Sequence, residues 1–230
     1  MNFKAWFALL GICLCCGCST LRQVDELPPD TYVLPGKVLV PKSDIMKRTP
    51  EKIKATLQLT DSALIIKPVL PGEPLLYLNL QEPQNLKFYR RTFDVDVLTI
   101  PFKIRPSVQS FPEQLNSNFS AALYLGRRFD YYHLKSKKKV KSNFISGFGG
   151  GYGGFLGLGA VTMNPFVTQN AINYEYDGFV LTGGAAGIYD AKKFNLGLAV
   201  GTDFLVDKNR RVWIYHRKPW FGLLFGINLN

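Results

Sequence analysis

The chain has 230 residues, a formal net charge of +11 at pH 7 and 47% hydrophobic residues. This length allows one large domain or two small ones. The positive charge comes without any nucleic-acid-binding signature, so nucleic acid is not expected as a partner. Anionic lipid headgroups or a solubilising surface excess remain as explanations of the charge.

The first eighteen residues differ from all that follow. MNFK is a short cationic start, and AWFALLGICLCC is an apolar run too short to span a bilayer as a helix. Gly17 then precedes Cys18, and a polar, proline-containing stretch follows. The pattern predicts a signal peptide over 1–17 and a tether over 18–30. Cleavage would leave Cys18 as the only cysteine, which excludes an internal disulfide.

This start resembles a bacterial lipoprotein signal. In such signals a small residue precedes the cysteine that is lipidated and becomes the new N-terminus. The resemblance implies lipidation of Cys18 and a lipid-anchored mature chain. The alternatives are an ordinary secretory signal or an uncleaved anchor.

Residues 31–91 contain short apolar runs broken by proline and glycine, among them YVLPGKVLV, IKATLQL, ALIIKPVL and LLYLNL. Their length is typical of soluble strands and too short for membrane strands. We therefore expect a small β domain over 31–91, or a β subdomain docked on the part of the chain that follows. Within it, RTPEKIKATL could instead form a short helix, with Thr49 as its cap and Pro50 in its first turn.

From residue 92 the segments lengthen and become rich in glycine and aromatic residues. In FNLGLAVGTDFLV, residues 194–206, alternate positions are large and apolar while the others are small or polar, which is the period of a strand. The predicted long strands are 93–105, 117–131, 144–161, 178–189, 194–206 and 219–229. The parity of the first of these shifts near Pro101, where we expect a bulge or a bend.

These patterns predict an all-β fold, with a small N-terminal β region followed by an antiparallel, barrel-like sheet over 92–230. Strands of ten to twelve residues can cross a bilayer at a tilt. The apolar face would then meet lipid, or it would meet a protein core as in a lipocalin-like barrel. A glycine-zipper membrane helix over 144–163 is a third option, disfavoured because glycine costs about 1 kcal/mol per residue inside a helix.

The strand count leaves the closure of the barrel open. Single-chain membrane barrels begin at eight strands, whereas six long strands are clear here. LKFYR and RVWIYH could supply two more, or the glycine-rich segment could fold into two strands. Otherwise the barrel is open, completed by the N-terminal region, or closed by oligomerisation.

Polar side chains on the small-residue faces predict an inward network. Its candidate members are Asp94, Asp96, Asp203 and Asn228. A buried charge needs a partner, and Arg105 or Arg128 could supply it. No metal-ligand spacing or phosphate loop occurs in the sequence, so no metal and no cofactor are expected.

Two other groups could carry function. The lysines of KSKKKVKS could bind anionic lipid headgroups or form a solvated loop; they are Lys135, Lys137, Lys138, Lys139 and Lys141. His133 and His216 could serve a lipid-modifying enzyme as nucleophile or base. Both lie beside aromatic residues at strand ends, which favours a place in an interfacial aromatic girdle.

The lipoprotein-like start, the short β region and the strands ending in PWFGLLFGINLN together resemble uncharacterised bacterial outer-membrane lipoproteins with a β-barrel-like C-terminal half. The resemblance implies a non-enzymatic envelope lipoprotein, structural or accessory, at the outer membrane. The alternatives are a lipid-modifying enzyme that uses His133 or His216, and a lipid-anchored soluble barrel that binds a small apolar ligand.

Overall fold

The structure is a computed structural model that describes residues 22–24, 26–36, 51–70, 72–108, 111–136, 144–190 and 195–228. Its strands join in one antiparallel sheet, part of which forms a ring. The all-β, barrel-like fold class predicted from the sequence is confirmed.

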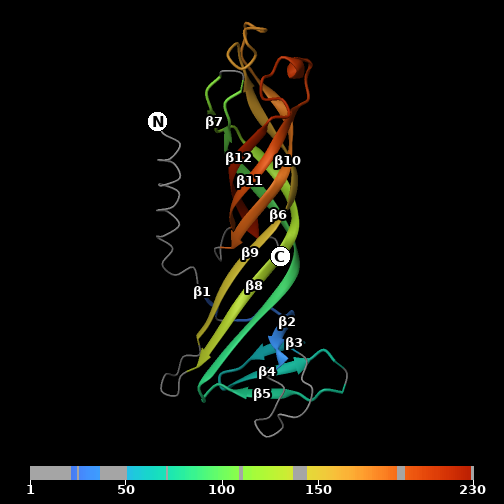
Figure 1. The fold of residues 1–230 in the computed structure, drawn as a ribbon, viewed down its shortest axis with the longest axis vertical. Helices are drawn as coiled ribbons and strands as arrows, with labels where there is room; N and C mark the ends of the chain where they lie inside the picture. Colours follow the sequence, from blue (N-terminus) through green and yellow to red (C-terminus); the bar gives the residue numbers. More distant parts are fainter. Residues whose placement is uncertain are drawn as a thin grey trace. The chain divides into compact units, whose positions relative to one another are not determined.

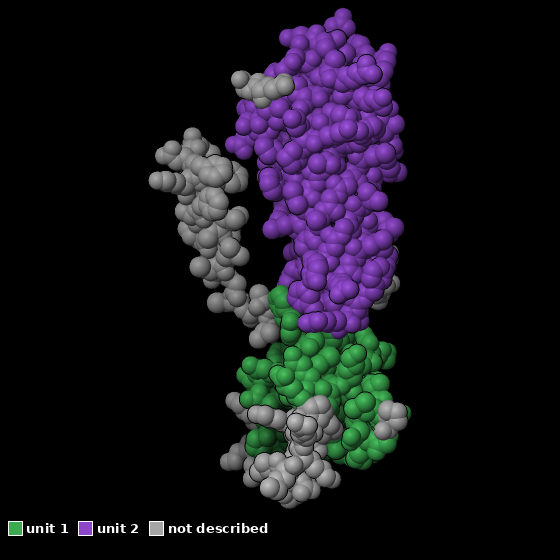
Figure 2. All heavy atoms as spheres, turned by 45° about the vertical axis from the view of Figure 1, so that its right-hand side comes forward, with its two compact units in different colours: residues 1–90, 130–148 green, residues 91–129, 149–230 purple. Residues whose placement is uncertain are grey.

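The chain divides into two compact units (Figure 2). Unit 1 comprises residues 1–90 and 130–148, and unit 2 comprises residues 91–129 and 149–230. The sequence places one boundary at 91/92, whereas the structure also assigns 130–148 to unit 1. The reason is that Tyr132, Leu134 and Ile145 pack in the core of unit 1, and such a return of the chain leaves no mark in local composition.

Unit 1 contains a sheet in the order β6-β2-β3-β4-β5, in which β2 to β5 are short, and a further strand, β1, pairs with the start of β9 (Phe144–Met163). Besides β9, the strands that begin in this unit are β1 (Arg22–Val24), β2 (Thr31–Pro35), β3 (Lys52–Leu59), β4 (Ala63–Pro68), β5 (Leu76–Asn79) and β6 (Gln84–Arg105).

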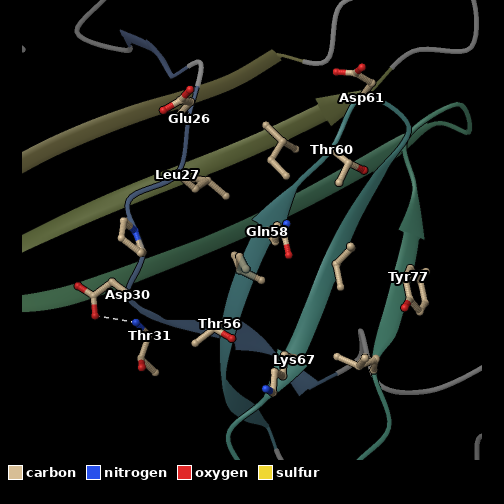
Figure 3. A pocket seen from close by; sticks show the side chains of 15 residues that line it. Glu26, Leu27, Asp30, Thr31, Thr56, Gln58, Thr60, Asp61, Lys67 and Tyr77 are labelled. Atoms are coloured by element: carbon tan, nitrogen blue, oxygen red, sulfur yellow. Dashed lines mark hydrogen bonds between the residues drawn. The ribbon is translucent and has the colours of Figure 1, made fainter.

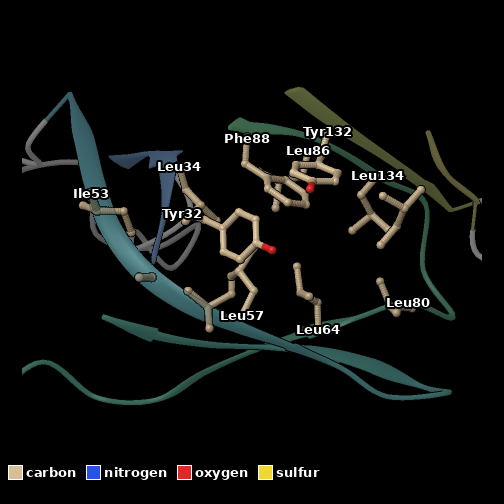
Figure 4. Close-up of a cluster of buried hydrophobic side chains, with 13 residues drawn as sticks. Tyr32, Leu34, Ile53, Leu57, Leu64, Leu80, Leu86, Phe88, Tyr132 and Leu134 are labelled. Atoms are coloured by element: carbon tan, nitrogen blue, oxygen red, sulfur yellow. The ribbon is translucent and has the colours of Figure 1, made fainter. Parts of the chain in front are cut away.

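The core of unit 1 is built from alternate residues of β2, β3, β4 and β6, joined by Leu80, Tyr132, Leu134 and Ile145 (Figure 4). Three rings meet at its centre: Tyr32 lies edge-on to Phe88 and Tyr132, at centroid distances of 5.6 and 5.7 Å, and Phe88 stacks on Tyr132 at 5.3 Å. Such aromatic pairs each add about 0.5–1.5 kcal/mol beyond the area that they bury.

The helix considered for RTPEKIKATL does not form; from Lys52 onward the segment is strand β3. Ile53, Ala55 and Leu57 are buried while the residues between them are exposed. This period of two lets β3 pair with β2 on one side and β4 on the other, so tertiary pairing overrides the local signal for a helix start. Thr49 and Pro50 lie outside the described residues.

Among the described residues, six strands of unit 2 pair around a ring in the order β6-β8-β9-β10-β11-β12, and β12 pairs in turn with β6. Figure 1 shows β9 to β12 side by side. Besides β6, the ring strands are β8 (Ser120–Ser136), β9 (Phe144–Met163), β10 (Tyr176–Asp190), β11 (Asn195–Leu205) and β12 (Pro219–Asn228). The short β7 (Gln114–Asn116) pairs with the end of β6.

The sequence segments considered as extra strands have other roles. LKFYR belongs to the first part of β6, and RVWIYH lies in the connection between β11 and β12, which contains the short 3-10 helix η2 (Lys208–Arg211). The glycine-rich segment forms one strand, β9, and not a helix.

The bulge expected near Pro101 is confirmed. Leu223 of β12 pairs with Phe102 of β6, but Phe225 pairs with Thr99, so β6 carries one extra residue in this interval. Before the bulge every buried residue of β6 is even-numbered, and after it Lys103 and Arg105 are buried instead. The extra residue therefore turns two cationic side chains into the ring.

Candidate functional site

The outward face of the ring carries a band of exposed, large apolar side chains, which we call the outer apolar band. It includes residues of all six ring strands, and Leu156 and Leu198 are 76% and 67% exposed. The members are Phe93, Val97, Phe102, Ile104, Leu123, Leu125, Tyr152, Leu156, Leu158, Phe179, Leu181, Leu196, Leu198, Val200, Phe221, Leu223 and Phe225.

The outer apolar band is unfavourable in water. Complete burial of one such side chain is worth about 1.5–3 kcal/mol, so leaving all of them half-exposed forfeits on the order of 10–20 kcal/mol. That is as much as the whole stability of a typical domain. An apolar surface of this extent marks a site of contact with lipid or with another protein.

The charged side chains of the ring include several that are buried on its inward face. Asp203 of β11 is fully buried and accepts a hydrogen bond from the ammonium of Lys103, 3.0 Å away. Arg105 pairs with the other carboxylate oxygen, and the indole Nε1 of Trp220 donates to Asp203 at 3.1 Å. One carboxylate therefore holds two cations and an indole in the interior, where an unpaired charge would be costly.

Two further polar contacts lie along the inward face. The Nδ2 of Asn195 donates to Asp96 at 2.6 Å, and Arg128 forms an ion pair with Asp190. Asp94 is also buried, at 3% exposure. Arg105 and Arg128, the two cations considered as partners, are thus both paired with carboxylates. Asn228 pairs with Asp96 through the strand register, but its side chain lies outside the described residues.

Small residues bring the ring strands close together. A Cβ placed at Gly157 would overlap the backbone oxygen of Ala121, and one at Gly184 would overlap the backbone oxygen of Val200. Tyr124, Phe155, Trp220 and Leu224 fill the space between the strands. The interior is therefore a packed core with embedded ion pairs.

One end of the ring is covered by the connections between strands. Trp213, Ile214 and Tyr215 of the β11–β12 connection pack with Val167 and Ile172 of the β9–β10 connection. The guanidinium of Arg105 lies over the rings of Trp213 and Tyr215, at 5.1 and 5.6 Å. These contacts anchor the covering loops to the charged interior.

Unit 1 has a groove of its own, about 1500 Å³ in volume (Figure 3). Thr56, Gln58 and Lys67 line it from the sheet, Tyr77 lines it from β5, and Asp30 lies at its margin. Its side chains are of both charge signs and mostly exposed. This composition is typical of a solvated surface and indicates no particular chemistry.

The two histidines belong to different units and make structural contacts. His133 is 2.7 Å from Oδ1 of Asn85. His216 accepts the amide hydrogen of Leu205 on Nδ1, at 3.3 Å, and its ring packs on Phe204 at a centroid distance of 4.9 Å. Desolvation, together with the positive charges of Arg217 and Arg210, lowers the pKa of His216.

The other sequence-based candidates fall mainly outside the described residues. Cys18 lies there, as do Lys137, Lys138, Lys139 and Lys141. Lys135 is exposed near the end of β8. The structure therefore shows only the first lysine of this proposed headgroup-binding run.

Sequence reasoning missed two sets of cations. Lys103 was assigned to no site, although the parity shift at Pro101 already implied that it turns inward. The second set is the five lysine and arginine side chains between Lys208 and Lys218. The density of positive charge in this segment could have indicated an anion-binding loop. Only the folded structure shows that several of these side chains line one groove.

Within the described ranges, no helix is long and apolar enough to cross a membrane. The same ranges contain no cluster of three or more histidine, cysteine or acidic side chains suited to hold a metal ion. Comparison of the chain with protein-family models, curated proteins and solved structures found no match.

Proposed function

We propose that the protein is a non-enzymatic lipoprotein of the bacterial cell envelope, with a structural or accessory role, whose ring of strands is embedded in the outer membrane. The observation that carries this proposal is the arrangement of the ring, which buries its ion pairs in a packed interior and exposes large apolar side chains on its outer face. A bilayer provides the apolar surroundings that such an outer face requires.

The two units provide an internal comparison. The exposed residues of β3 in unit 1 include Lys52, Lys54 and Gln58, whereas those of β11 in unit 2 include Leu196 and Leu198. Both strands alternate with the same period, so the difference lies in the solvent that each outward face is built for. The outward face of β3 suits contact with water, and the outward face of β11 suits contact with lipid.

Strand length supports the same proposal. β11 and β12 contain 11 and 10 residues, close to the 9–11 residues that a tilted strand needs to cross the hydrocarbon core. Within the described residues the ring has six strands, fewer than the eight of the smallest single-chain bacterial barrels. Its rows of glycine and alanine allow the closer approach of backbones that a narrower ring demands.

The packed interior favours this proposal over a soluble barrel with an internal ligand. A lipocalin-like carrier needs an apolar chamber. Here Trp220, Tyr124 and the ion pairs of Asp203 occupy the inward face. A lipid-modifying activity has no support from the histidine contacts described above, which tie His133 to Asn85 and His216 to Leu205.

Removal of the lipid anchor tests the proposal. The chain with Cys18→Ser, exported behind a signal peptide that is cleaved without lipidation, should incorporate no fatty-acid analogue. It should nevertheless remain in the outer-membrane fraction after an alkaline carbonate wash, because the outer apolar band still holds the ring in lipid. Release of this unlipidated chain into the soluble fraction would overturn the membrane-embedded ring.

Labelling of two cysteine variants with the fatty-acid analogue identifies which cysteine is lipidated. The wild-type chain and a Cys15→Ser chain should both incorporate the analogue, since Cys15 lies inside the predicted signal peptide. Persistent labelling of the Cys18→Ser chain would contradict lipidation at Cys18 and would leave the argument from the outer apolar band untouched.

A further inference from the structure

The β11–β12 connection and the β9–β10 connection border a groove of about 770 Å³ in unit 2, which we call the cationic groove. Arg210, Arg211, Arg217 and Lys218 line it, together with His216. None of the described residues lining it is acidic. Because like charges repel one another, a groove with this lining favours an anionic occupant.

Two of these cations share one aromatic ring. The guanidinium groups of Arg210 and Arg217 lie over Phe204, at 5.9 and 5.1 Å from the ring centroid. Stacking of this kind holds a guanidinium in place while its edges remain free to donate hydrogen bonds. The arrangement therefore sets out two planar donor groups at one site.

The loop that carries these cations is fixed to β11. The amide of Arg217 donates to the backbone oxygen of Asp203 at 2.9 Å, and the amide of Leu205 donates to Nδ1 of His216 at 3.3 Å. Arg217 also has a left-handed backbone, with φ of 59°, which is unfavourable for a non-glycine residue. Surrounding contacts maintain this strain and keep its side chain over Phe204.

Two acidic residues flank the groove in sequence, and both are already engaged. Asp203 holds Lys103 and Arg105 on the inward face. Asp207 accepts hydrogen bonds from the hydroxyl of Tyr176 at 2.6 Å and from the amide of Asn209 at 2.7 Å. It does not line the cationic groove. The arginines of the groove thus face a site that a ligand can neutralise.

We propose that the cationic groove binds the phosphate of an anionic lipid headgroup. Arginine pairs with phosphate through two parallel hydrogen bonds. Phe204 lies on the same outward parity of β11 as Leu198 and Val200, so a headgroup in the groove can have its acyl chains on the outer apolar band. This inference rests on the proposed embedding of the ring in a membrane, because a groove beside the bilayer surface would meet the phosphates of lipid headgroups.

The test uses the full chain in detergent micelles, titrated with dioleoyl phosphatidic acid and followed by native mass spectrometry. We expect the wild type to retain phosphatidic acid in preference to dioleoyl phosphatidylcholine. The double variant Arg210→Gln/Arg217→Gln should bind phosphatidic acid about tenfold or more weakly, since each cation near a lipid surface contributes about 1 kcal/mol. Both arginines are exposed, so this variant should fold.

A control variant has the same change of net charge elsewhere. Lys52→Gln/Lys54→Gln removes two exposed cations from β3 of unit 1 and should leave phosphatidic acid binding unchanged. Equal binding by the wild type and the groove variant would overturn the proposal, as would an equal loss in both double variants.

Two further arms identify the source of the phosphate and separate this proposal from the preceding one. In the first arm, inorganic phosphate is added at the same concentration as phosphatidic acid. If it displaces the lipid, the groove is a site for free phosphate and the lipid assignment is overturned. A fluorescent label on Leu198→Cys, quenched by doxyl-labelled lipid in phosphatidylcholine vesicles, reports whether the ring enters a bilayer that contains no anionic lipid. If doxyl-labelled lipid quenches this label but the groove variant binds phosphatidic acid as the wild type does, only the headgroup site is refuted. If the label is not quenched, the embedded ring is refuted.

Discussion

The ammonium of Lys103 lies 3.0 Å from the carboxylate of Asp203, and both side chains are buried on the inward face of the ring. Because Arg105 and Trp220 also bind this carboxylate, Asp203 connects β6, β11 and β12. Its backbone oxygen accepts the amide of Arg217. A single residue thus joins the charged interior to the loop of the cationic groove.

Replacement of Asp203 by asparagine should be strongly destabilising. The change leaves the buried cations Lys103 and Arg105 without their carboxylate, and the loss of one partner from a buried pair typically costs about 3–5 kcal/mol. Urea unfolding of the full chain in lipid vesicles measures this free energy. Asp177→Asn is the control, because Asp177 is exposed and should change the free energy of unfolding by less than about 0.5 kcal/mol. Similar values for the two variants would contradict the role given to Asp203.

The close approach of the ring strands predicts opposite effects at two glycines. Gly157→Ala should destabilise the chain by about 1–3 kcal/mol, because the new methyl group overlaps the backbone of β8 and the strands must separate. Gly187→Ala has open space around the new methyl group and should be neutral, or stabilising by up to about 1 kcal/mol. Unfolding free energies measured in the same vesicles would contradict the packed ring if Gly157→Ala were tolerated as well as Gly187→Ala.

The loop of the cationic groove should show a pH dependence through His216. Desolvation and the charges of Arg217 and Arg210 lower its pKa in the folded state, below the value of about 6.5 in the unfolded chain. The folded state then binds fewer protons than the unfolded state in this range. The contribution of His216 to stability is therefore complete above about pH 6.5 and is lost as the pH falls through the folded pKa.

Histidine NMR signals recorded against pH give this folded pKa directly. Arg217→Gln removes one of the two charges and should move the pKa of His216 upward, toward its usual value. The matched change Lys67→Gln, in unit 1, should leave the titration of His216 where it was. A folded pKa at or above 6.5 in the wild type would contradict the environment described for this imidazole.

If the outer apolar band lies in lipid, a charged residue introduced into it should destabilise the folded chain by an amount that depends on its position along the strand. An arginine in place of Leu198, near the middle of β11, should cost about 2–4 kcal/mol in a bilayer, and an arginine in place of Thr202, nearer the strand end, should cost less. Gln58→Arg on the exposed face of β3 should lie within about 0.5 kcal/mol of the wild type. In a soluble barrel, Leu198→Arg would change the free energy of unfolding as little as Gln58→Arg does. That result would contradict the embedding of the ring in a bilayer.

The faces of the ring strands could be predicted from the sequence because alternation is a local property. Along 194–206 the expected apolar parity includes Leu196, Leu198 and Val200, and all three are exposed in the structure. The parity change at Pro101 likewise predicted the bulge in β6. Both predictions depend only on residues adjacent in the chain, where the two-residue period of a strand is visible.

The features that were missed depend on contacts between distant segments. Tyr132 and Leu134 continue the alternation of β8 without a break, so nothing local shows that they enter the core of unit 1. The capping signals Thr49 and Pro50 suggested a helix, but pairing with β2 and β4 made Lys52–Leu59 a strand. The cationic groove arises where Arg210 and Arg217 fold over Phe204, which a linear count of charges cannot show.

The most direct measurement concerns the solvent that β11 meets. Single cysteines at Leu196, Leu198, Val200 and Ala199, in a full chain whose native cysteines are changed to serine, can carry a fluorescent label. The labelled chain is placed in vesicles and exposed separately to doxyl-labelled lipid and to aqueous iodide. Gln58→Cys in unit 1 provides the reference for a strand face in water.

We predict that doxyl-labelled lipid quenches the labels at positions 196, 198 and 200, and that it leaves those at 199 and 58 unquenched. Iodide should quench the label at 58 alone, because position 199 faces the packed interior. If iodide instead quenches the labels at 196, 198 and 200 as it does at 58, and the doxyl lipid reaches none of them, the ring does not lie in a bilayer.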